Sequence, residues 1–122
     1  MVKVKKDEVR ENRIVDEIIV DAYGEGEQAL GWYYYLEQKL KFPFTARCIK
    51  KRPTSPLTVE DEVKVIGMPS EDDCMNEMFV EIRWEDKNIA VPLSQLKVIQ
   101  ATDETREVVE DWHYWVGMGY QF

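Results

Sequence analysis

The chain has 122 residues, a length that fits one domain with a single core. Its 16 Lys and Arg against 24 Asp and Glu give a net charge of −8, which disfavours nucleic acids and anionic membranes because both are negatively charged. With 44% hydrophobic residues the chain can bury a core, so we expect residues 1–122 to form one folded domain.

The cysteines and the first residues bear on the compartment. Cys48 and Cys74 lack the Cys-x-x-Cys spacing of redox and metal motifs, so we expect two reduced, buried thiols. The N-terminal MVKVKKDEVR lacks the apolar core of a signal peptide, and no run reaches the roughly 20 apolar residues of a membrane span. We therefore expect a cytoplasmic monomer.

Two helices are predicted at the N-terminal end. The first begins near Asp7, places Val15, Ile18, Ile19 and Ala22 on its apolar face, and ends near Tyr23 at a left-handed Gly24. The second begins at Glu25 to Glu27 and ends before Pro43. Gly31 inside it would let another backbone approach closely beside Trp32. Its predicted buried face consists of Ala29, Trp32, Tyr33, Leu36 and Leu40, widened by Leu30 and Tyr34.

Five short strands and a last helix follow. Alternating apolar residues predict strands near residues 44–50, 62–68, 78–84, 89–92 and 97–100, with one 3₁₀ turn after Pro92. The fold class is therefore α+β: two N-terminal helices, a small five-stranded SH3-like antiparallel β-barrel, and a C-terminal helix packed on it. Thr102 or Asp103 caps that helix, and the apolar tail should dock on the domain. The predicted buried face of the helix is Val108, Val109, Trp112, Trp115 and Val116.

Catalytic residues are scarce. His113 is the only histidine, it lies between Trp112 and Trp115, and no serine stands in a nucleophile-elbow context. The aromatic residues follow helical spacing, which favours core packing over a small-molecule site at their seam. Enzymatic function is disfavoured.

The acidic residues are distributed unevenly. Residues 60–86 contain ten Asp and Glu against Lys64 and Arg83. Hard cations, calcium above all, take six to eight oxygen ligands and tolerate loop geometry, although no EF-hand motif is present. Charge alone favours the simpler interpretation, that the acidic turns are solvated loops on an acidic domain. The three clusters are the turn Asp21, Glu25, Glu27; the strand entry Glu60, Asp61, Glu62; and the loop Glu71, Asp72, Asp73 with Glu77.

Three separated motifs carry a family resemblance. The runs GWYYYLEQKLKFPFTARC, IAVPLSQL and DWHYWV, in this order between Asp16 and Trp115, resemble the cyanobacterial calcium-binding protein family CcbP. The resemblance implies a small acidic cytosolic protein that buffers calcium reversibly without catalysis, linked in some cyanobacteria to calcium-dependent cell differentiation. The motifs consist mostly of packing residues, so the resemblance does not place individual calcium ligands.

The predicted calcium ligands therefore come from acidic clustering, with Glu37 added as the one carboxylate inside the first motif. Loop ligands on an exposed surface predict modest affinity, on the order of micromolar to millimolar. The expected partners are calcium ions and a regulatory protein. The alternative hypothesis is an SH3-like interaction module that recruits a basic partner. The predicted metal ligands are Asp21, Glu25, Glu27, Glu37, Glu60, Asp61, Glu71, Asp72, Asp73 and Glu77.

Overall fold

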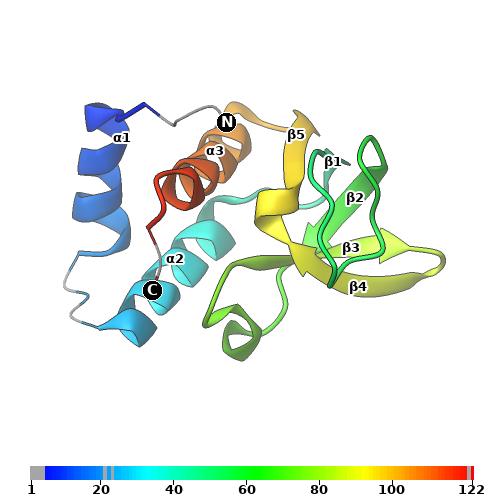
Figure 1. The fold of residues 1–122 in the computed structure, drawn as a ribbon, viewed down its shortest axis with the longest axis horizontal. Helices are drawn as coiled ribbons and strands as arrows, with labels where there is room; N and C mark the ends of the chain where they lie inside the picture. Colours follow the sequence, from blue (N-terminus) through cyan, green and yellow to red (C-terminus); the bar gives the residue numbers. More distant parts are fainter. Residues whose placement is uncertain (1–4, 21, 23, 121) are drawn as a thin grey trace.

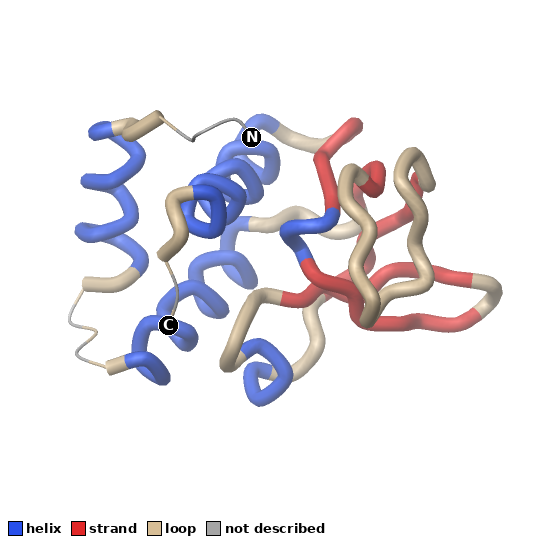
Figure 2. Tube along the Cα trace, in the orientation of Figure 1, coloured by secondary structure: helices blue, strands red, loops and turns tan. Residues whose placement is uncertain are grey.

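A computed structural model describes residues 5–20, 22, 24–120 and 122. The fold is α+β, with the long helices gathered beside one antiparallel sheet (Figures 1 and 2). The described part of the chain holds no helix of the length and apolar character needed to cross a membrane.

The N-terminal helix differs from its prediction. Helix α1 (Glu8–Arg13) is capped by Asp7 and widens into the π-helical turn η1 (Ile14–Ile18), in which the Ile19 amide donates to the Ile14 carbonyl at 2.9 Å. This wider turn shifts the register, so Ile14 and Ile18 are buried while Val15 is 53% exposed. The predicted inward position of Val15 is wrong for that reason.

The predicted end of this helix is also wrong. The helical turns stop at Ile18, and the expected endpoint Tyr23 lies outside the described residues. Gly24 has a φ of −142° and precedes the next helix in an extended conformation, so it does not act as a left-handed stop.

Helix α2 (Glu25–Lys39) carries the central packing face. Tyr34 is 45% exposed, contrary to prediction, whereas Tyr35 is buried. A Cβ built on Gly31 would lie 2.3 Å from the Ile18 carbonyl oxygen, which confirms the predicted close backbone approach. The predicted apolar face is otherwise confirmed as buried at Ala29, Trp32, Tyr33, Leu36 and Leu40.

The strands form one open sheet in the order β4-β3-β2-β1-β5, all antiparallel. The described strands β4 and β5 are its edges, so the SH3-like barrel expected from the sequence is not confirmed. The 3₁₀ turn η2 (Glu71–Cys74) separates β2 from β3, and η3 (Leu93–Gln95) separates β4 from β5. The strand bounds are β1 Phe44–Cys48, β2 Glu62–Gly67, β3 Phe79–Trp84, β4 Lys87–Pro92 and β5 Leu96–Gln100.

Helix α3 (Asp103–Gly117) closes the core against α2. Thr102 caps it, as predicted, by accepting from the Thr105 amide at 3.1 Å. The ring centroids of Trp32 and Trp112 lie 5.0 Å apart, so the two helices meet through aromatic edges. The predicted burial of Val116 is wrong, since this residue is exposed. The tail docks as predicted: the Tyr120 ring centroid lies 5.0 Å from that of Trp115.

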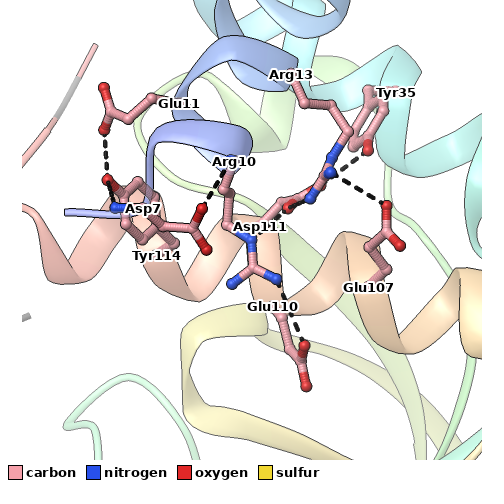
Figure 3. A network of polar contacts seen from close by, with 9 residues as sticks. All are labelled: Asp7, Arg10, Glu11, Arg13, Tyr35, Glu107, Glu110, Asp111 and Tyr114. Atoms are coloured by element: carbon pink, nitrogen blue, oxygen red, sulfur yellow. Dashed lines mark hydrogen bonds and ion pairs between the residues drawn. The ribbon is translucent and has the colours of Figure 1, made fainter. Parts of the chain in front are cut away.

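A buried carboxylate ties α1 and α2 to α3 (Figure 3). Asp111 is 0% exposed, and its carboxylate accepts from Arg13 Nη2 at 2.6 Å and from the Tyr35 hydroxyl at 2.9 Å. Arg10 Nε lies 2.9 Å from the same carboxylate. Because two guanidinium groups and a phenol surround it, this negative charge is compensated inside the fold.

Candidate calcium site

The loop around η2 lies against the outer side of helix α2, and two tyrosines join the two segments. The Tyr33 hydroxyl donates to the Pro69 carbonyl at 2.6 Å, and the Tyr34 hydroxyl donates to Glu71 Oε2. Both tyrosines are consecutive on α2, so one helical turn holds both ends of the loop segment 69–71. We call this region, with its surrounding acidic residues, the α2–η2 junction.

Burial and nearby carboxylates raise the pKa values of the two tyrosines at this junction. Burial first, and then the nearby Glu37 carboxylate, raise the pKa of Tyr33 to about 12. The hydrogen bond to Glu71 raises the pKa of Tyr34, and Glu37 acts in the same direction. Glu37 and Glu71, from α2 and η2, therefore influence the same pair of phenols. The structure brings these two predicted residues into one neighbourhood.

The acidic turn before α2 lies beside the same loop. A Cβ on Gly26 would be 3.5 Å from the Met75 side chain, directly after η2. Glu25 and Glu27 flank Gly26 in sequence, and Asp72 and Asp73 stand exposed on η2. The described parts of two of the three acidic clusters predicted from sequence therefore lie on neighbouring segments.

Cations do not neutralise most of these acids. Within the part of the chain that the structure describes, no Lys, Arg or His forms an ion pair with Glu25, Glu37, Glu71, Asp72 or Asp73. The partners of Glu71 and Asp73 are neutral hydroxyl groups, the latter being Ser70 at 3.4 Å. Hydroxyl partners leave the full negative charge of a carboxylate in place, so the junction attracts a cation.

Glu77, also predicted as a ligand, is engaged elsewhere. Its two carboxylate oxygens face Arg52, at 2.6 Å from Nη2 and 3.2 Å from Nη1. A bidentate guanidinium of this kind neutralises the carboxylate and fixes its orientation. Glu77 is therefore held in an ion pair with Arg52.

The third predicted cluster lies at the entry to β2, away from η2 (Figure 1). Asp61 Oδ2 accepts from the Thr58 amide at 2.9 Å and so stabilises a turn. Arg47 lies 3.9 Å from Glu60 and 3.5 Å from Glu62. Local partners therefore satisfy this cluster, and the structure does not bring Glu60 or Asp61 to the junction. Asp21, the remaining predicted ligand, lies outside the described residues.

The donor chemistry of the junction fits a hard cation. Its available groups are carboxylate, carbonyl and phenol oxygens, and calcium takes six to eight oxygen ligands. Among the described residues no group of three or more His, Cys, Asp or Glu side chains is already close enough to hold a metal. Like charges repel without a cation, so calcium ligation here would require exposed acids to converge, with carbonyl groups and water completing the shell.

The sequence interpretation missed the tyrosines and the arginine. Tyr33 and Tyr34 were assigned to the apolar core, although the hydroxyls of both reach the η2 loop. The acidic residues around YYY were the only signal available. The sequence does not predict that Arg52 neutralises Glu77, which lies 25 positions further along the chain. This contact depends on how the β1–β2 loop folds back.

Other reactive side chains are held within the fold. Cys48 and Cys74 are buried free thiols, as predicted, and burial raises the pKa of Cys74. His113 Nε2 lies 2.6 Å from the Leu96 carbonyl, and burial lowers the pKa of this imidazole. Soft-metal ligation and nucleophilic chemistry therefore have little support from these groups.

The fold is a small acidic α+β domain, and carboxylates lie on the exposed side of helix α2 and on the adjoining turns. These features are typical of proteins that bind cations at their surface. Comparisons with known proteins make this specific. Residues 12–116 match the family model of CcbP, whose description is calcium binding. The chain belongs to this calcium-binding family.

Two solved structures are similar to this chain over its full length. The crystal structure of Anabaena CcbP is 42% identical to this chain, with a TM-score of 0.87 and 100% of both chains covered. A calcium binding protein in the calcium-binding form is 41% identical, with a TM-score of 0.86 and the same coverage. A search of curated protein sequences found no match.

Proposed function

We propose that this chain binds Ca²⁺ reversibly at the α2–η2 junction, with the carboxylates of Glu37 and Glu71 at its centre. The observation that carries the proposal is the attachment of Glu71 to α2 through the Tyr34 hydroxyl, a neutral partner, while no described cationic side chain pairs with Glu37 or Glu71. Asp72, Asp73 and Glu25 would supply further oxygens from the adjoining turns.

The geometry favours calcium over magnesium and a modest affinity. Calcium accepts irregular sets of six to eight oxygens, whereas magnesium requires a near-octahedral shell and gives up its waters reluctantly. Exposed acids on a short turn and a helix surface form an irregular, solvated set. We expect dissociation constants on the order of micromolar to millimolar.

We further propose that the chain is a cytoplasmic, monomeric calcium buffer that performs no catalysis and does not use an EF-hand. The 42% identity to Anabaena CcbP over the full chain supports this view, as do the buried cysteines and the partly buried histidine. A regulatory protein would be a partner. The sheet would belong to the SH3-like class through its meander β1 to β4, with β5 returning to pair with β1.

Isothermal titration calorimetry tests the site. Calcium is titrated into the wild-type protein, into the variant Glu37→Gln/Glu71→Gln, and into the matched control Glu60→Gln/Glu62→Gln. Both variants remove two carboxylates from exposed or partly exposed positions, so the change in net charge is the same. We expect the junction variant to bind calcium at least about tenfold more weakly, equivalent to about 1.4 kcal/mol.

The control should stay within about threefold of wild type, because Arg47 already pairs with both substituted residues, Glu60 and Glu62. Equal losses in both variants would show that only overall charge matters. A larger loss in the control would move the site to the β2 entry and overturn the assignment.

A further inference from the structure

A groove separate from the calcium junction lies between the start of α1, strand β5 and helix α3. It has a volume of about 540 Å³, and its lining includes Lys5, Ile49, Lys97, His113 and Tyr114. None of the acidic residues predicted as calcium ligands lines it. The groove is therefore a second surface with its own composition.

Two exposed lysines supply positive charge at this groove. Lys5 and Lys97 are exposed, and in the described part of the chain neither has an ion-pair partner. Of the acids in the lining, Glu110 lies 3.7 Å from Arg10, whereas Asp7 accepts from the Arg10 backbone amide at 3.0 Å, a neutral donor that leaves its negative charge in place. In a chain with a net charge of −8, the two lysines at one groove concentrate positive charge there, with one carboxylate, Asp7, beside them.

The groove also has an apolar side. Ile49, directly after β1, is 45% exposed, and the mostly buried Tyr114 also lines the wall. The Tyr114 hydroxyl is held by the Asp7 amide at 3.0 Å and by Glu11 at 2.7 Å, which fixes this wall in position. An apolar contact beside exposed ammonium groups matches a ligand that combines an apolar side chain with carboxylates.

We propose that this groove binds an acidic peptide segment of a partner protein, with an apolar side chain on Ile49 and carboxylates facing Lys5 and Lys97. Lys50 and Lys51 follow Ile49 and extend the positive surface along the β1–β2 loop. A long polyanion such as nucleic acid is disfavoured, because the acids elsewhere on the surface repel it. The proposal reverses the charge of the partner expected from composition alone, which was basic.

Fluorescence anisotropy with a labelled eight-residue peptide, in which Glu residues flank a Leu-Phe pair, tests the proposal. The measurements use the full chain in chelator, so that calcium binding does not enter. We expect saturable binding that weakens at higher salt, because exposed charge pairs are screened. The variant Lys5→Glu/Lys97→Glu should weaken binding at least about tenfold, as charge reversal opposes both contacts. The variant Ile49→Ser should weaken it by a smaller factor.

The matched control is Lys64→Glu/Lys87→Glu, which makes the same charge change at exposed positions outside the groove. It should keep binding within about threefold of wild type. Absence of peptide binding, or equal losses in the two double variants, would overturn the proposal. Binding of a peptide with Lys in place of Glu at equal strength would also overturn it. Sedimentation showing that the chain pairs with itself through Lys5 and Lys97 would instead assign the groove to a second copy.

Discussion

Two carboxylates in this protein have opposite surroundings. Asp111 is buried between two arginines and a tyrosine, and its charge joins three helices (Figure 3). Glu71 accepts from the Tyr34 hydroxyl, and among the residues that the structure describes no cationic side chain forms an ion pair with it. A carboxylate matched by guanidinium groups stabilises the fold, whereas one matched by neutral hydroxyls keeps its charge for an external cation. The residues around a carboxylate therefore determine whether its charge is neutralised within the fold.

The largest expected effect is on stability at Asp111. The substitution Asp111→Ala leaves Arg10 and Arg13 without their buried counter-charge, and we expect the free energy of unfolding to fall by about 3–5 kcal/mol. Urea unfolding followed by tryptophan fluorescence measures this loss. Glu107→Ala is the control, because Glu107 contacts the same Arg13 at 3.5 Å but its side chain is 53% exposed. Its cost should stay below about 1 kcal/mol, and a similar cost for both variants would remove the contrast.

Alkaline pH should weaken the fold through the tyrosines. The folded protein keeps the Tyr33 proton up to a pKa of about 12, whereas the unfolded chain loses it near 10. This contribution is therefore complete below pH 10 and is lost as the pH rises toward 12, on the order of 2–3 kcal/mol. Burial followed by the Asp111 carboxylate raises the pKa of Tyr35 and acts in the same direction.

Urea unfolding at several pH values, with tyrosinate absorbance in parallel, checks this prediction. Tyr33→Phe should flatten part of the decline, since a phenylalanine cannot titrate. A decline of unchanged steepness in this variant would mean that Tyr33 does not link the junction to stability.

At the junction the expected effect is on binding and not on folding. Glu71→Gln should lower calcium affinity about tenfold, or about 1.4 kcal/mol, and change the free energy of unfolding by less than about 0.5 kcal/mol. Titration calorimetry and urea unfolding on one preparation separate the two quantities. A stability loss as large as that of Asp111→Ala would mean that Glu71 is a structural residue.

The smallest expected effect is on calcium affinity, when Glu77 loses its arginine partner. Arg52→Gln removes the guanidinium from Glu77, whose carboxylate then adds negative charge close to η2. We expect calcium affinity to rise about threefold, because a charge several ångströms away in water contributes less than about 1 kcal/mol. Titration calorimetry measures the change. Weaker calcium binding in this variant would show that the Arg52–Glu77 pair orients the loop for binding.

Much of the fold followed from local patterns. The period-two alternation at Val80 and Ile82 predicted β3, and the helical spacing of Trp32 and Leu36 predicted the core face of α2. The prediction failed at Ile14 to Ile18, where a π-helical turn adds a residue and turns Val15 outward. A periodicity argument assumes a constant helical repeat, so it cannot see such a turn.

The sequence predicted only part of the candidate site. The acids at Glu37 and at Glu71 to Asp73 could be named from composition, but nothing local distinguished them from Glu60, Asp61 or Glu77. Their difference lies in contacts across long stretches of chain: Tyr34 with Glu71, and Arg52 with Glu77. Those contacts depend on how the β1–β2 and η2 loops fold back on the core.

The sequence by itself determined the acidic charge, the order of helices and strands, and the family, because composition, periodicity and motifs are local properties. Only the tertiary structure decided which carboxylates have an arginine partner and which remain free for a cation. It also placed Lys5, Ile49 and Lys97, far apart in the chain, around one groove. Charge pairing and concave surfaces form between distant segments, and packing brings those segments together.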